Sequence, residues 1–309
     1  MQRVLTTVTL LGLLVATAAA FAITEHLKLI KSPVYGTLVS KVLSPVCDCS
    51  ESKASIRIRL RHRDRVTVKI LGSGGDTVAT VASGAQMPAR RHLRFVWDGG
   101  TDTGARAPDG VYHAEVHLAN AHRTILLPNR ILLDTKTPEV LSANRAKPVL
   151  FAGPGSSVAI RYTFSEQANA VVYLRGRRII RGRPTRQHYR VKWTGKLDGR
   201  ALRAGTYVLS VGALDVAGNQ TPPAARKKVT IVVRYIEIAP QRLTIRAGSR
   251  ITLHLETAAP RYTWRLGHRH GARRGKLLRL GAPTTPGTYR LVVGEHGHTA
   301  TALLRVRAK

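Results

Sequence analysis

Apolar and polar positions alternate with a period of two through most of the chain. The clearest example is the segment 56–61, in which every second residue is an arginine. In a β-strand, this pattern places Ile56, Ile58 and Leu60 on a core face and the arginines on the opposite face. The segments 66–70 and 93–97 alternate in the same way. Because no segment after residue 31 has a helical period, the pattern predicts an all-β protein.

A repeated motif begins at Phe95 and returns about 95 residues later at Val191. The first copy reads FVWDGGTDTGARAPDGVY, and the second reads VKWTGKLDGRALRAGTY. We expect each tryptophan to fill a core at the end of an inward-facing strand, and the glycines to permit the tight loop that follows. A period of this length suits a seven-stranded β-sandwich. The matched positions are Trp97 with Trp193, Gly99 with Gly195, Gly110 with Gly205 and Tyr112 with Tyr207, and a fainter third copy covers Pro286–Tyr289.

The strand and loop sequences around the first repeat are characteristic of a known family. They are RVTVKI at 65–70, FVWDG at 95–99 and PDGVY at 108–112. On these motifs, residues 52–134 resemble the FlgD/Vpr-type bacterial immunoglobulin-like domain, the Ig-like module of flagellar hook-capping proteins and of secreted bacterial proteases. Residues 137–234 resemble a divergent copy of it. The resemblance implies a module that stabilises or presents other parts of an exported bacterial protein, and it implies no flagellar role.

The N-terminal residues differ from the rest of the chain. Val4–Ile23 is a continuous run of apolar or small residues, long enough to cross a bilayer as a helix. A signal peptide with a cleavage site at Ala18–Ala20 is the competing interpretation. Both interpretations place the C-terminal domains outside the cytoplasm, either in a single-pass protein of the cell membrane or in a secreted protein. The predicted fold is therefore a set of tandem Ig-like β-sandwiches behind one N-terminal hydrophobic helix. The predicted parts are an anchor or signal peptide at 1–23, an extended lead-in at 24–50, Ig-like sandwiches at 51–136 and 137–234, and a small β-sandwich at 235–309.

Basic residues dominate the charge of the chain, with 50 Lys and Arg against 17 Asp and Glu and a formal net charge of +33. Self-repulsion of this size favours a polyanionic neighbour. We therefore predict polyanion binding through arginine clusters, with an anionic envelope polymer, lipid head groups or extracellular nucleic acid as the partner; a solvated arginine-rich surface is the alternative. Sequence-specific nucleic-acid recognition is not expected, because the chain has no helix-turn-helix or zinc module. The clustered residues are Arg57, Arg59, Arg61, Arg63, Arg175, Arg177, Arg178, Arg181, Arg183, Arg269, Arg273 and Arg274.

Three further groups of side chains are candidates for disulfide formation or metal binding. For Cys47 and Cys49, a local or intermolecular disulfide, redox or metal chemistry, and inert thiols all stay open. Asp98, Asp102 and Asp109 have the ligand type that Ca²⁺ prefers, but turn capping is favoured because the second repeat keeps only one aspartate in this loop. For the His-x-His pairs at 268–270 and 296–298, solvated hairpin tips are favoured, with chelation of a transition metal as the alternative. No cofactor and no metal site is predicted.

Motifs of common catalytic sites are missing from the sequence. It contains no G-x-S-x-G, no H-E-x-x-H and no G-x-x-x-x-G-K-[ST]. We therefore predict that the chain is no enzyme but an exported cell-envelope protein, a structural or adhesive rod of Ig-like modules. The alternative function is an accessory module that recognises anionic polymer through its arginine clusters.

Overall fold

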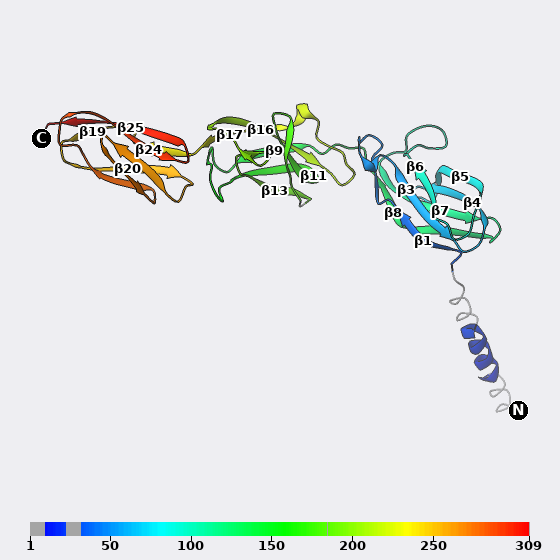
Figure 1. The fold of residues 1–309 in the computed structure, drawn as a ribbon. Helices are drawn as coiled ribbons and strands as arrows, with labels where there is room; N and C mark the ends of the chain where they lie inside the picture. Colours follow the sequence, from blue (N-terminus) through cyan, green and yellow to red (C-terminus); the bar gives the residue numbers. More distant parts are fainter. Residues whose placement is uncertain (1–9, 23–31, 184, 309) are drawn as a thin grey trace. The chain divides into compact units, whose positions relative to one another are not determined.

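The computed structural model describes residues 10–22, 32–183 and 185–308, and these residues are almost entirely β-structure (Figure 1). Within these ranges, the helical segments are residues 10–22 and the short 3₁₀ turns η1 (Ser50–Ser52) and η2 (Pro223–Ala225). The predicted all-β fold class is confirmed. Contacts divide the chain into two compact units, residues 1–135 and residues 136–309.

The predicted hydrophobic segment Val4–Ile23 lies partly outside the described residues. Within the described ranges, no helix combines the length and the apolar character that crossing a bilayer requires.

The strands of the first unit form one β-sandwich. Its two sheets have the strand orders β1-β3-β6 and β2-β8-β7-β4-β5. The strands are β1 (Val34–Val39), β2 (Val42–Leu43), β3 (Ala54–Leu60), β4 (Asp64–Leu71), β5 (Thr77–Met87), β6 (Leu93–Trp97), β7 (Gly110–Leu118) and β8 (Arg123–Leu133). Strands β1 and β2 come from the residues expected to form an extended lead-in. Because β1 pairs with β3 and buries Val34 and Val39, this segment is part of the sandwich.

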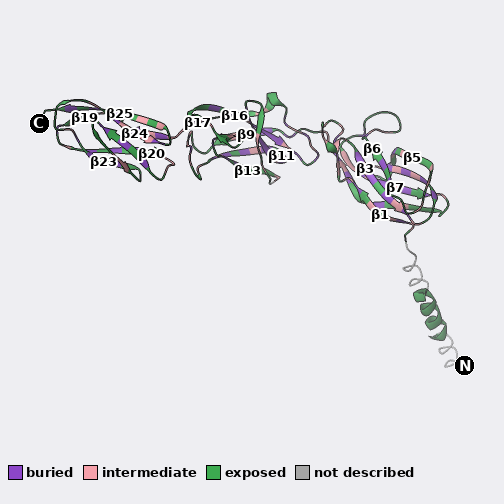
Figure 2. Cartoon of the chain, in the orientation of Figure 1, coloured by how far each residue is buried: buried purple, intermediate pink, exposed green. Residues whose placement is uncertain are grey.

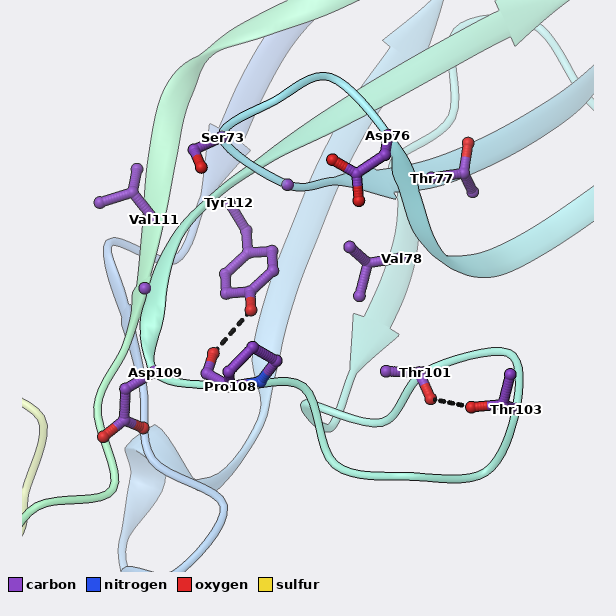
Figure 3. Close-up of a pocket in the computed structure, with 12 residues that line it drawn as sticks. Ser73, Asp76, Thr77, Val78, Thr101, Thr103, Pro108, Asp109, Val111 and Tyr112 are labelled. Carbon is purple, nitrogen blue, oxygen red and sulfur yellow. Dashed lines mark hydrogen bonds between the residues drawn. The ribbon is translucent and has the colours of Figure 1, made fainter.

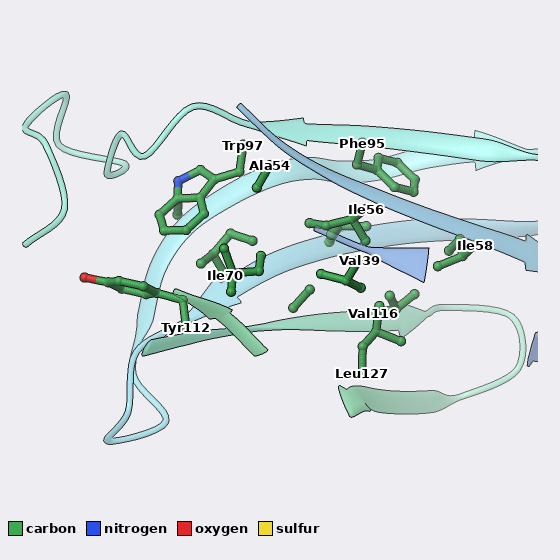
Figure 4. Close-up of a cluster of buried hydrophobic side chains, with 14 of the residues drawn as sticks. Val39, Ala54, Ile56, Ile58, Ile70, Phe95, Trp97, Tyr112, Val116 and Leu127 are labelled. Atoms are coloured by element: carbon green, nitrogen blue, oxygen red, sulfur yellow. The ribbon is translucent and has the colours of Figure 1, made fainter. Parts of the chain in front are cut away.

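The core of this first sandwich lies between the two sheets (Figure 4). Ile56, Ile58 and Leu60 of β3 are at most 1% exposed, so the alternation predicted for this strand is confirmed. Figure 2 shows the same alternation of buried and exposed residues along the strands. Trp97 ends β6 inside this core, where its ring packs edge-on against Tyr112 at 5.0 Å between centroids.

The second unit contains a sandwich with its own core, which includes Trp193. Its longest strand, β11, pairs with four other strands: residues 158–164 pair with β9 and β13, whereas residues 169–174 pair with β16 and β12. The strands are β9 (Val140–Arg145), β10 (Val149–Phe151), β11 (Val158–Leu174), β12 (Arg177–Arg181), β13 (Arg186–Trp193), β14 (Lys196–Leu197), β15 (Arg200–Ala201), β16 (Gly205–Leu214) and β17 (Lys227–Arg234).

A further sandwich in the second unit begins at Ile236 and encloses a third core, which includes Trp264. Its sheets have the orders β18-β20-β23 and β19-β25-β24-β21-β22. The strands are β18 (Ile236–Ala239), β19 (Arg242–Arg246), β20 (Arg250–Thr257), β21 (Tyr262–Leu266), β22 (Arg269–Arg273), β23 (Leu277–Gly281), β24 (Gly287–Glu295) and β25 (His298–Arg307). Each core therefore contains one of the 3 tryptophans of the sequence.

The repeated motif forms the same local structure in the first two sandwiches. Trp97 Nε1 donates to the carbonyl of Gly100 at 2.8 Å, and Trp193 Nε1 donates to the carbonyl of Lys196 at 3.1 Å. The hydroxyl of Tyr112 donates to the carbonyl four residues earlier at 2.6 Å, and Tyr207 does the same at 2.8 Å. In the fainter third copy, Tyr289 makes the corresponding bond at 2.9 Å. This bond fixes the chain that enters the following strand, as the tyrosine corner does in other Ig-like sandwiches.

Candidate polyanion-binding surfaces

The outer face of the sheet β1-β3-β6 carries a row of arginines. Arg57 and Arg59 alternate with the buried residues of β3, and Arg61 follows directly after the strand. Arg94 of β6 lies directly opposite Arg57 in the antiparallel register. None of the residues in these three strands is acidic. We call this surface the first arginine face.

Neutral partners hold two side chains of the first arginine face. Arg61 Nε donates to the carbonyl of Ser32 at 2.8 Å, and its guanidinium carbon lies 4.9 Å from the centre of the Tyr35 ring. Arg94 Nε donates to the hydroxyl of Ser55 at 3.1 Å. These contacts orient the guanidinium groups and leave their positive charge uncompensated.

The second sandwich has an equivalent surface, formed by β9, β13 and the first half of β11. Arg161 of β11 lies directly opposite Arg190 of β13, and Lys192 lies opposite Ala159. Arg94 and Arg190 each precede the repeated tryptophan by three residues, so the two arginine pairs occupy the same place in the two repeats. We call this surface the second arginine face.

Sequence reasoning placed Arg57, Arg59 and Arg61 on one face, and the structure shows them there, together with an exposed Arg63 in the turn before β4. It missed the cross-strand partners of both arginine faces. The signal that identifies them is an arginine three residues before the tryptophan in RFVW and again in RVKW.

The cluster at 175–183 lies on and beside an edge strand. β12 pairs with β11 and ends the strand order of its sheet. Charged side chains on an edge strand hinder pairing with a second chain. Arg177 also forms an exposed ion pair with Asp198 at 2.8 Å. The members are Arg175 in the turn before β12, Arg177, Arg178 and Arg181 on β12, and Arg183 after it.

The predicted cluster of Arg269, Arg273 and Arg274 does not form one group in the structure. Arg269 and Arg273 of β22 line one cavity with Arg250 and Arg279, which come from β20 and β23. Arg274 lies in the turn after β22. No sequence pattern joins Arg250 to this group, because the two sheets bring it there only when they pack together.

The cysteines and the loop aspartates have defined partners. Cys47 and Cys49 form a disulfide, with Cα atoms 5.3 Å apart. Asp98 accepts a hydrogen bond from the amide of Gly100 at 3.0 Å, which is turn capping within its own loop. Asp102 accepts from the amide of Thr80 at 2.7 Å, and Asp109 accepts from the amide of Thr135 at 2.9 Å. The three carboxylates therefore stabilise three different connections.

A cavity of about 490 Å³ lies at the tyrosine end of the first sandwich (Figure 3). Asp76, Asp109 and Tyr112 line it. Burial raises the pKa of the Tyr112 hydroxyl, and the negative charges of Asp109 and Asp76 raise this pKa further. The hydroxyl donates to the carbonyl of Pro108 and stays protonated near neutral pH, so it serves packing rather than base chemistry.

Comparisons with known proteins agree with the sandwich fold. The chain is a set of immunoglobulin-like β-sandwiches, and within it residues 47–122 match the family described as the FlgD Ig-like domain. This match confirms the resemblance predicted for the first repeat, over about a quarter of the chain. No curated protein matches the chain. Domains of this family and fold are typically non-catalytic, and they act as structural or binding modules.

Several solved structures are similar at low sequence identity. The titin segment I67–I69 is 10% identical, with a TM-score of 0.31, and the match covers 91% of this chain and 100% of that one. The SGBP-B protein of the Bacteroides ovatus mixed-linkage glucan utilization locus, solved with a mixed-linkage heptasaccharide, is 13% identical, with a TM-score of 0.28 and coverage of 91% and 69%. The D0–D1 segment of intimin is 12% identical, with a TM-score of 0.26 and coverage of 64% and 98%. No functional conclusion follows from similarities of this size.

Proposed function

We propose that this chain is a non-catalytic, exported cell-envelope protein whose Ig-like sandwiches adhere to an anionic wall polymer. The observation that carries this proposal is the pair of arginines directly opposite each other on two neighbouring strands, at the same place in two repeats. Like charges in that position destabilise a sheet. Their presence in both copies is explained by a polyanion that compensates them.

The geometry of both arginine faces suits an extended polymer. Arg57, Arg94, Arg161 and Arg190 are all exposed on the surface of a sheet. Guanidinium groups bind phosphate and carboxylate groups through paired hydrogen bonds. Two such faces in one chain also raise the apparent affinity for a polymer that is long enough to engage both.

Export is the second part of the proposal. It rests on the resemblance of residues 47–122 to a module of exported bacterial proteins and on the apolar N-terminal sequence. The net charge of +33 fits a setting at the cell surface, where acidic polymers are abundant.

Binding of the full chain to a purified glycerol-phosphate wall polymer tests the proposal. We expect binding at low salt that weakens steeply as salt rises, since charged contacts are screened. The double variant Arg57→Gln and Arg94→Gln is expected to lower the affinity about tenfold, which corresponds to about 0.7 kcal/mol for each lost contact. Calorimetric titration measures the affinity, and neutral dextran serves as the control polymer.

The matched control removes the same charge from the other sheet of the same sandwich. Arg123 and Arg130 are exposed on β8, away from the first arginine face. We expect Arg123→Gln with Arg130→Gln to change the affinity by less than about threefold. If both double variants weaken binding equally, the effect is one of net charge and the assigned face is wrong. If the full chain ignores the polymer at low salt, the proposed function fails.

A further inference from the structure

A cavity in the third sandwich concentrates positive charge without an acidic residue in its wall. Its volume is about 480 Å³. Four arginines line it, and none of the other lining residues is charged. The full lining is Gly248, Arg250, Trp264, Arg269, Arg273, Arg279, Leu280 and Gly281.

The arginines of this cavity come from three strands that belong to two sheets. Arg269 and Arg273 lie on β22, the edge strand of the larger sheet, whereas Arg279 lies on β23, the edge strand of the smaller sheet. Arg250 of β20 lies beside β23, opposite Gly281 in the register. Arg269 Nη1 donates to the carbonyl of Gly281 at 2.9 Å, so its side chain bridges the two edges. The cavity is therefore built where the sandwich opens between two edge strands.

Nearby acidic groups do not balance this charge. The carboxylate of Glu256, on the same strand as Arg250, is paired with Lys276 at 3.0 Å. Arg273 donates to the backbone carbonyl of Ala272 at 3.2 Å, which is a neutral partner. Guanidinium groups gathered around one cavity repel one another unless an anion lies between them.

The rest of the wall carries no charge, and its two large side chains contribute little accessible surface. Trp264 is 7% exposed and Leu280 is 6% exposed, so both belong mainly to the core and only their edges reach the cavity. Gly271 permits the indole to lie against β22, because a Cβ atom there would stand 3.1 Å from Trp264 Nε1. At Gly281 a Cβ atom would meet only the Arg269 guanidinium, at 4.0 Å, so the missing side chain leaves free space.

We propose that this cavity binds a sugar phosphate, with the phosphate dianion among the arginines and the sugar hydroxyls accepting hydrogen bonds from the remaining guanidinium groups. A cavity of this volume is in the range of small-molecule sites and is larger than a phosphate ion needs. The clustered guanidinium groups match a compact, multiply charged oxyanion. This inference goes beyond the adhesive function proposed above, because it concerns a different sandwich and a small ligand.

Calorimetric titrations of the full chain test this site. The probes are glucose 6-phosphate, inorganic phosphate and glucose, all at one ionic strength. We expect glucose 6-phosphate to bind at least about tenfold more tightly than inorganic phosphate, and glucose not to bind, because the phosphate supplies the charge and the sugar hydroxyls accept further hydrogen bonds from the guanidinium groups. Equal affinities for the two phosphates would overturn the sugar-phosphate assignment.

Three variants locate the binding. Arg273→Gln with Arg279→Gln is expected to lower the affinity for glucose 6-phosphate at least about tenfold. Gly281→Leu is expected to do the same without changing the charge, because it fills the cavity. The control Arg305→Gln with Arg307→Gln removes the same charge from β25 of the same sandwich and is expected to leave the affinity within about threefold.

The outcomes separate this site from the arginine faces. Circular dichroism and thermal unfolding establish that each variant is folded. If the cavity variants and the β25 control weaken binding equally, or if Gly281→Leu binds normally, the cavity is not the site. The variant Arg57→Gln with Arg94→Gln is expected to bind glucose 6-phosphate normally even where it loses the wall polymer, so either proposal can fail while the other stands.

Discussion

Gly99 shows how a single residue fixes the loop after the repeated tryptophan. Its φ is 87°, in the left-handed region that favours glycine. A Cβ atom at this position would lie 2.7 Å from Pro45 Cγ and 3.3 Å from a methyl group of Leu133. Gly195 has the same role in the second repeat, with a φ of 74° and a distance of 3.0 Å to Leu150. The sequence motif thus marks a place where the backbone must approach its neighbours closely.

Substitutions at Gly99 and at a control glycine separate two contributions to stability, the strain of a positive φ and the close contact of a Cβ atom with its neighbours. We expect Gly99→Ala to destabilise the first sandwich by about 1 kcal/mol through backbone strain and by about 1–3 kcal/mol more through the clash with Pro45. The control Gly104→Ala has the strain alone, since the φ of Gly104 is 82° and no atom lies within 4 Å of its would-be Cβ. Hydrogen exchange measured by mass spectrometry reads the stability of this sandwich separately. Equal effects of the two substitutions would contradict the contact argument.

At the scale of strands, two positive charges of the first arginine face repel each other. Arg57 and Arg94 lie on adjacent strands and face the same side of the sheet. The strands are held together by their buried residues, such as Ile56 opposite Phe95. Burial of these side chains offsets the repulsion, so the sheet forms despite the two opposed charges.

Removing one arginine of the pair is therefore expected to stabilise the protein. Arg94→Gln should raise the free energy of unfolding of the first sandwich by about 0.2–1 kcal/mol at low salt, and the gain should shrink as salt rises. Arg123→Gln removes the same charge from β8 without an opposing arginine and should have a smaller effect. Urea unfolding at two salt concentrations measures both. A loss of stability in Arg94→Gln would show that the pair is not under repulsion, and the main support for polyanion binding would be lost.

Strands with a regular alternation of apolar and polar residues could be predicted from the sequence. Features that depend on which strands pair with each other could not. Ile56 and Trp97 were expected inside because alternation and the repeat are visible in the chain itself. Strand β1 was expected only as an extended lead-in, because Gly36 interrupts its alternation and its partner β3 comes some twenty residues later. The cavity of the third sandwich was not foreseen for the same reason: Arg250 and Arg279 meet only through the β20–β23 register.

For the whole molecule, the burial of tyrosines makes the stability of the folded state depend on pH in the alkaline range. The pKa values of Tyr112, Tyr162, Tyr235 and Tyr262 are all raised above the ordinary value, in each case mainly by burial. These residues are spread over both units of the chain. Between pH of about 10 and the raised values, the unfolded chain loses the tyrosine proton while the folded chain retains it. The folded state binds more protons in this range, so stability is complete below pH 10 and falls as the pH rises further.

Tyr162→Phe tests this linkage at a single position. The Tyr162 ring stacks on Phe164 at 4.3 Å, and its buried hydroxyl has no hydrogen-bond partner among the described residues. The substitution keeps the stacking and removes an unpaired polar group, so we expect little change in stability at pH 7. Above pH 10 the variant should lose stability less steeply than the unaltered protein, as measured by urea unfolding between pH 7 and 11.5. Loss of lysine charge acts in the opposite direction, because it relieves the repulsion of a chain with a net charge of +33. If stability instead rises above pH 10, relief of charge repulsion outweighs tyrosine ionisation, and the alkaline limit of this fold is set by its surface rather than by its cores.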